Sequence, residues 1–124
     1  MKYLFGIFFW LFSFFFGTSD VPEEAIAALK QGKVNELIAL FDEKVSIKII
    51  NQEDVLSKSQ AEANIKYFFE KHPVKTFSSS HVSSKGNSLQ YLTGFLETNN
   101  GKFRVSILIR ANKITQFRIE NANE

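Results

Sequence analysis

Residues 75–120 carry the pattern that most limits how this chain can fold. Hydrophobic and polar residues alternate along four successive segments, and two of the joints between them are Gly86-Asn87 and Asn100-Gly101. Alternation is typical of β-strands with one buried face, and Asn-Gly is a strong hairpin signal. The sequence therefore predicts an antiparallel meander with strands at residues 75–84, 88–98, 102–110 and 114–120.

Two helices are predicted near the start of the folded part. Asp20 and Pro22 suit the first turn of a helix, and Gly32 is a typical residue just after a helix end. Apolar residues at helical spacing then predict a second helix over residues 34–41. Residues 42–44 are all charged and are expected to end it.

A short strand and a third helix precede the meander. Residues 45–49 alternate like a strand. Ser57 and Gln60 have the spacing of a capping box, which predicts a helix over residues 58–71 that ends before Pro73. This order indicates the α+β class, with three N-terminal helices packed on a curved antiparallel sheet of four main strands plus a short early strand.

The first 19 residues have the three parts of a secretory signal peptide: a short positive start, an apolar run over residues 4–16, and small residues at 17–19. A helix that crosses a bilayer needs roughly 20 apolar residues, so the run is too short to span; an uncleaved N-terminal anchor is the alternative. We expect residues 1–19 to be a signal peptide and residues 20–124 a single domain. That domain is expected to be exported, periplasmic or extracellular, with no stable membrane anchor after cleavage.

Composition limits the possible functions. Without Lys2, the chain has 14 basic and 13 acidic residues, a balance that predicts neither a nucleic-acid-binding protein nor a polybasic membrane-binding one. The chain has no Cys, which excludes disulfides, thiol nucleophiles and thiolate metal sites. Its two His residues form no metal-binding motif, and we predict no metal site and no cofactor.

Burial of one sheet face sets the expected strand register. We expect two-residue turns at Gly86-Asn87 and Asn100-Gly101, and a three-residue loop at residues 111–113 because it keeps Phe117 and Ile119 on the apolar face. The inner face, under the helices, is then expected to contain Phe77, Ser79, His81, Leu92, Gly94, Leu96, Phe103, Val105, Ile107, Ile109, Phe117 and Ile119.

The outer face of the same sheet is expected to be mixed. In this register Glu97 lies opposite Arg104, and Tyr91 lies opposite Arg110. The residues expected on this face are Tyr91, Phe95, Glu97, Arg104, Leu108, Arg110, Ile114, Arg118 and Glu120.

The sequence also resembles a known family. The residues that carry the likeness are Ser57, Lys58, Gln60, Ala61, Glu62, Phe68, Phe69, Pro73, Gly94, Gly101, Phe103, Arg104 and Val105. They are similar to a family of small exported bacterial proteins with no assigned function, within the nuclear transport factor 2-like, or cystatin-like, superfamily. The resemblance implies export and a cone-shaped space between helices and sheet. It carries no catalytic residue to transfer, and a shared fold does not establish a shared function.

Four residues are candidates for contact with a ligand in this cone: His81, Ser79, Tyr67 and Leu92. His81 is the most polar residue expected inside and could bind a ligand or act as a base, but no acid partner is placed beside it. The simpler interpretation is a His satisfied by neighbouring serines or water. Phe77, Phe103 and Phe117 could also fill the cone and leave no room for a ligand.

Three functional hypotheses follow. The first is a non-enzymatic exported module that binds itself or another protein through the outer sheet face, at Tyr91, Phe95, Arg104, Leu108, Arg110 and Arg118. The second is a carrier of a small apolar ligand in the cone. The third, which we favour least, is a hydrolase or isomerase that uses His81; we predict no catalytic residue beyond that possibility.

Overall fold

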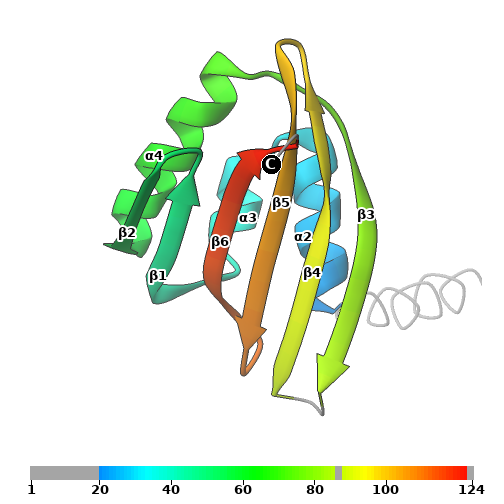
Figure 1. Cartoon of the computed structure of the whole chain (residues 1–124). Coiled ribbons are helices and arrows are strands. Elements are labelled where there is room, and N and C mark those ends of the chain that lie inside the picture. Colours follow the sequence, from blue (N-terminus) through cyan, green and yellow to red (C-terminus); the bar gives the residue numbers. More distant parts are fainter. Residues whose placement is uncertain (1–19, 86–87, 123–124) are drawn as a thin grey trace, which may run out of the picture.

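The computed structural model describes residues 20–85 and 88–122, in which three helices cover one face of a curved, open, six-stranded sheet (Figure 1). The elements in chain order are α2 (Val21–Gln31), α3 (Val34–Ile38), β1 (Phe41–Ile49), β2 (Gln52–Ser57), α4 (Lys58–Lys71), β3 (Val74–Lys85), β4 (Leu89–Thr98), β5 (Gly101–Arg110) and β6 (Lys113–Asn121). Across the sheet the order is β2-β1-β6-β5-β4-β3. β1 and β6 run parallel, and all other neighbours are antiparallel. The α+β class is confirmed.

The prediction of four main strands plus one short strand was wrong, because the sheet has six strands and includes a parallel pair. β1 begins at Phe41, where the sequence pattern predicts the end of a longer second helix. Phe41 pairs with Ile114 of β6 and packs its ring 5.8 Å from that of Phe117. Burial of this aromatic side chain against β6 therefore overrides the local helical spacing.

β2 is the strand that the pattern does not predict. It forms a hairpin with β1 through a two-residue turn at Ile50-Asn51. Ile50 has a φ of 59°, an uncommon conformation for a β-branched residue, and its backbone N–H donates to the carbonyl oxygen of Ile119 at 2.8 Å. This hydrogen bond ties the hairpin turn to β6. β2 then passes directly into α4, so α4 lies between β2 and β3 in the chain.

The helix ends follow the predicted chemistry in two of three cases. Ser57 and Gln60 form both hydrogen bonds of the capping box at the start of α4, as predicted. Gly32 ends α2 in the left-handed conformation, and the Lys33 N–H donates to the carbonyl oxygen of Ala28 at 2.9 Å. Asp20 occupies the first capping position, but its side chain makes no capping hydrogen bond.

The space between helices and sheet is filled by side chains. Phe77, Phe103 and Phe117 are 1%, 5% and 1% exposed. From the helices, Leu29, Ile65 and Phe68 are also buried, and the ring of Phe68 lies edge-on to that of Phe103 at 5.2 Å. The interior is thus a packed core at the place where the sequence analysis considered a ligand-binding cone.

The β4–β5 register differs from the prediction by two residues. Thr98 pairs with Gly101, so the turn is Asn99-Asn100. The predicted pairs were wrong: Phe95 lies opposite Arg104, and Tyr91 lies opposite Leu108. A shift by two keeps every side chain on its predicted face, whereas a shift by one would have reversed all of them.

The β5–β6 hairpin combines a tighter turn with a bulge. Ala111 and Asn112 have φ values of 49° and 65°, which fit a two-residue type I′ turn, so the predicted three-residue loop was wrong. The register then shifts between Leu108 and Ile109. Phe117 and Ile119 lie on the inner face as predicted. Ile114, on the turn side of the bulge, is buried opposite Ile109 and does not belong to the exposed outer face.

Ion pairs join β2, β1 and β6 on the outer face. Lys48 Nζ lies 2.9 Å from Glu120 Oε2, and Arg118 lies 3.5 Å from the same oxygen and 3.3 Å from Glu53 Oε2. The hydrogen bond from Lys48 and the positive charges of Lys48 and Arg118 hold the pKa of Glu120 below its ordinary value, although partial burial acts in the opposite direction. Lys48 and Glu120 thus bridge the parallel β1–β6 pair.

We expect Gly94→Ala to destabilise the domain by about 3 kcal/mol, the upper end of the range for overpacking. A Cβ at Gly94 would lie 2.4 Å from Phe77 Cζ and 2.5 Å from the Ser78 carbonyl oxygen, and the backbone oxygen cannot move aside cheaply. Urea unfolding measures the change. The control is Thr76→Ala, at an exposed position of β3, expected to stay within about 0.5 kcal/mol. Equal stability of the Gly94 variant and the parent would contradict this close approach.

We expect Glu120→Gln to lower the free energy of unfolding by about 1 kcal/mol at neutral pH. The folded-state pKa of Glu120 is lowered, so its contribution is fully present above the unfolded-state pKa of about 4.3 and is lost as the pH falls through the folded-state pKa. Parent and variant should therefore converge in acid in a urea-unfolding series against pH. Glu97→Gln, at an exposed acid of the same sheet face, is the control. A constant difference at all pH values would contradict the assignment.

Candidate functional site

The outer sheet face carries three partly exposed apolar side chains: Tyr91, Phe95 and Leu108, here called the outer-face patch. Tyr91 of β4 is 40% exposed and lies directly opposite Leu108 of β5. Phe95 lies four residues further along β4, on the same face. Lys102 Nζ lies 5.0 Å from the centre of the Phe95 ring, a cation–π distance. On this face Thr93 and Ser106 lie between Phe95 and the Tyr91–Leu108 pair.

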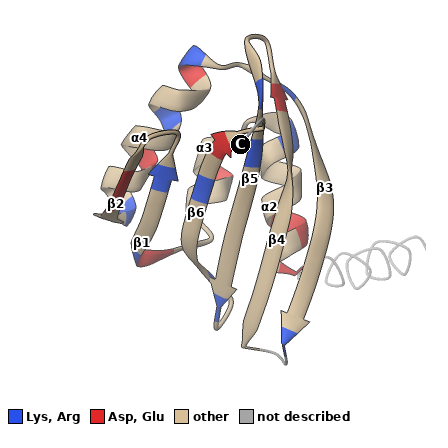
Figure 2. Cartoon of the chain, viewed as in Figure 1, with Lys and Arg blue, Asp and Glu red and all other residues tan. Residues whose placement is uncertain are grey.

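Charged residues surround the outer-face patch and leave its centre free of charge. Figure 2 shows that the middle parts of β4 and β5 carry no charged residue, while both signs of charge occur at their ends and on β1, β2 and β6. Of the predicted interaction residues, Arg118 forms ion pairs with Glu53 and Glu120, and Arg104 lies opposite Glu120. Arg110 is exposed at the end of β5.

The four predicted ligand-binding residues are not brought together. His81 was expected on the inner face, but the register shifts between Ser79 and His81, so His81 pairs with Thr93 and is exposed on the opposite face. Ser79 is exposed on β3, and Tyr67 is 61% exposed on α4, with Lys71 Nζ 5.4 Å from its ring centre. Leu92 is fully buried in the core.

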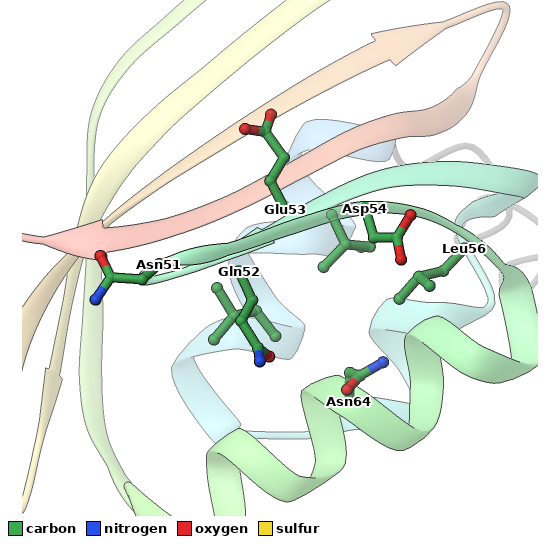
Figure 3. A pocket seen from close by; sticks show the side chains of 8 residues that line it. Asn51, Gln52, Glu53, Asp54, Leu56 and Asn64 are labelled. Atoms are coloured by element: carbon green, nitrogen blue, oxygen red, sulfur yellow. The ribbon is translucent and has the colours of Figure 1, made fainter.

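A groove of about 480 Å³ lies between the β1–β2 hairpin and α4; we call it the hairpin groove (Figure 3). Its lining consists of Ile47, Ile49, Asn51, Gln52, Glu53, Asp54, Leu56 and Asn64. The register pairs Ile47 with Asp54 and Ile49 with Gln52, which places these four side chains on the sheet face toward α4. In Figure 3, Glu53 points away from α4, and Asn64 rises from α4 below the hairpin.

The polar groups of the hairpin groove are held by short local contacts. Asp54 Oδ1 accepts the Val55 N–H at 2.8 Å, and Asn64 Nδ2 donates to the Gln60 carbonyl oxygen at 3.1 Å. The capping box of Ser57 and Gln60 stabilises the junction at which β2 passes directly into α4. Amides and one inward carboxylate above an aliphatic floor suit binding through hydrogen bonds and apolar contact.

The hairpin groove was not predicted, because residues 52–57 do not show the pattern of a strand. Gln52, Glu53 and Asp54 are poor strand formers and look like a loop. The available signal was the capping box of Ser57 and Gln60, which follows directly. Burial of side chains contributes little to this strand, because its first four residues are exposed.

A second groove, of about 440 Å³, lies where α3 meets the last turns of α4. Its walls include Lys33 and Glu36, which form an ion pair at 3.6 Å, and Phe69. Near this end of α4, His72 Nδ1 donates to the Phe68 carbonyl oxygen at 3.1 Å, so His72 caps the helix. Lys33 and Glu36 are thus used in a structural ion pair.

Over residues 20–85 and 88–122, no group of His, Cys, Asp or Glu side chains is arranged to hold a metal ion. In the same part of the chain, no helix combines the length and the apolar character needed to cross a bilayer. The predicted signal peptide, residues 1–19, lies outside the described residues.

Comparison with solved structures places the fold among known proteins. A DUF4783 family protein from Bacteroides uniformis is 34% identical, with a TM-score of 0.79 over 85% of this chain and 100% of the other. One from Bacteroides ovatus is 30% identical, with a TM-score of 0.78 over 86% and 100%. An NTF-2 like protein of unknown function from Burkholderia xenovorans is 12% identical, with a TM-score of 0.61 over 84% and 83%, a likeness of fold alone.

The predicted resemblance to a small-protein family with an NTF2-like or cystatin-like fold is therefore confirmed. No curated protein sequence matches the chain. The family model that does match is described as a domain of unknown function, DUF4783, and it covers residues 22–121. This chain belongs to the DUF4783 family and has its NTF2-like fold.

Proposed function

We propose that this protein is an exported, non-enzymatic interaction domain that binds a protein surface, most simply that of a second copy, through its outer sheet face. The observation that carries the proposal is the outer-face patch. Tyr91 is 40% exposed and adjoins Leu108, and no charged residue lies among Leu89–Leu96 of β4 or among residues 105–109 of β5.

The arrangement of charge supports this use of the face. An apolar centre with a polar, charged rim is the usual anatomy of a protein interface. Acids and bases on β1, β2 and β6 neutralise one another, so the rim has no strong field of one sign. Such a surface favours a protein partner over a nucleic acid, whose phosphates select a basic face.

Export is part of the proposal and rests on the sequence of residues 1–19. A positive start, a short apolar run and small residues at its end form a secretory signal. We propose cleavage near residue 19, after which residues 20–124 act in the periplasm or outside the cell without a membrane anchor. A domain without Cys must then be stabilised by its core and ion pairs alone.

The packing of the interior favours this function over a carrier of an apolar ligand inside the cone. Phe77, Phe103 and Phe117 occupy the space that a carrier would keep open. His81, the residue on which an isomerase or hydrolase would depend, is exposed on the opposite face and has no carboxylate placed beside it by the strand register.

We expect Leu108→Glu to weaken association at least about tenfold, because it places a charge at the centre of a face that becomes desolvated on binding. Sedimentation velocity of residues 20–124 over increasing concentration measures self-association. Native mass spectrometry of the protein purified from its own host detects a different protein partner. The control is Val82→Glu, which adds the same charge at a 45% exposed apolar position opposite Leu92, on the other sheet face.

Association that is lost in the Leu108 variant and kept in the Val82 variant supports the proposal. A protein that is monomeric at all concentrations and carries no partner from its host would overturn it. The proposal would also be overturned if both variants associated like the parent, because the interface would then lie elsewhere.

A further inference from the structure

We infer that the hairpin groove is a second binding site, which takes an extended peptide segment with a basic side chain. The segment pairs its backbone with the free edge of β2 and places the basic side chain beside Asp54. This site is separate from the outer-face patch, and the inference does not depend on the function proposed for that patch.

The first support is the edge itself. β2 is the terminal strand of the sheet and pairs with β1 alone among the described strands. Its first four residues are exposed. An edge strand presents a row of backbone N–H and C=O groups that an extended peptide can use for strand addition.

The second support is the groove that runs under this edge. Side chains of an added strand alternate between the two sheet faces, and those directed toward α4 would enter the hairpin groove. Ile47, Ile49 and Leu56 supply an apolar floor, and Asn64 supplies an amide on the opposite wall. The volume of about 480 Å³ lies within the usual range for binding sites of roughly 300–1,000 Å³.

The third support is charge. Glu53 is directed to the outer face and is paired there with Arg118 at 3.3 Å. Asp54 lies on the groove side and, among the described residues, forms no ion pair; its Oδ1 accepts the neighbouring Val55 N–H. The groove lining holds no Lys, Arg or His. A carboxylate that lies beside an open strand edge and has no cation near it favours binding of a basic peptide segment and disfavours binding of an acidic one.

The other end of the sheet does not offer the same combination. β3 is also a terminal strand, but a bulge at Ser79–His81 interrupts its pairing, and Lys75 and Lys85 lie near its ends. Bulges and lysines are common features of edges that avoid further pairing. Neither of the two grooves described above is lined by a β3 residue. Strand addition is therefore specific to β2.

The test uses fluorescein-labelled octapeptides titrated with residues 20–124 and followed by fluorescence anisotropy. An alternating lysine–valine peptide should bind about tenfold more tightly than an alternating glutamate–valine peptide of the same length. Asp54→Asn, which keeps the shape of the side chain and removes its charge, should weaken binding of the lysine peptide about three- to tenfold. Glu70→Gln, at an exposed acid near the far end of α4, is the matched control and should bind like the parent.

Hydrogen exchange with the lysine–valine peptide bound provides the second readout. Residues 52–57 should exchange more slowly in the complex, while β4 and β5 should be unchanged, because strand addition protects the edge amides. Binding with no protection of β2, or equal weakening in the Asp54 and Glu70 variants, would overturn the inference in favour of general charge attraction. Full displacement of the peptide by the same concentration of N-acetyl-lysine methylamide would overturn it in favour of a small-cation site.

Discussion

The parallel pairing of β1 with β6 is the contact on which the rest of this structure depends. It joins the N-terminal half of the chain to the meander, since Phe41 lies opposite Ile114 and Ile47 lies opposite Phe117. Burial of these four side chains supplies the driving force. On the opposite side of the sheet, Lys48 and Glu120 bridge the same two strands. Once β1 is fixed in this way, its hairpin partner β2 must become the sheet edge, and α4 must pack beneath that edge.

The faces of the meander could be predicted from the sequence, whereas the partners across strands could not. Burial of alternate residues fixes which face a side chain occupies, and a register error of two residues leaves that assignment intact. Assignment of side chains to a face from alternation fails at bulges. His81 and Ile114 both lie beyond a register shift, and both were assigned to the wrong face. The extra residues are Ser80 and Thr115, and the alternating pattern alone does not distinguish either of them from an ordinary outward-facing strand residue.

The hairpin groove could not be predicted from the sequence for a different reason. Its strand, β2, has little buried surface, so no hydrophobic period marks it. The strand exists because β1 offers a ladder of hydrogen bonds and because Ser57 fixes the passage into α4. The capping box was visible in the sequence and predicted α4 within its observed bounds. An element held in place by its neighbours can be found only after those neighbours have been positioned.

The alternation of β2 also separates the two proposed binding surfaces of this small domain. Glu53 and Asp54 are adjacent, yet they serve opposite faces: Glu53 joins the ion pairs of the outer face, and Asp54 borders the hairpin groove. The outer-face patch lies on β4 and β5, separated from β2 by β1 and β6. A partner on the patch and a peptide on the β2 edge would therefore approach from different directions and compete for no side chain. The ion pairs hold β2, β1 and β6 together, and the pairing of β6 with β5 continues the same sheet to the outer-face patch, so both surfaces belong to one sheet.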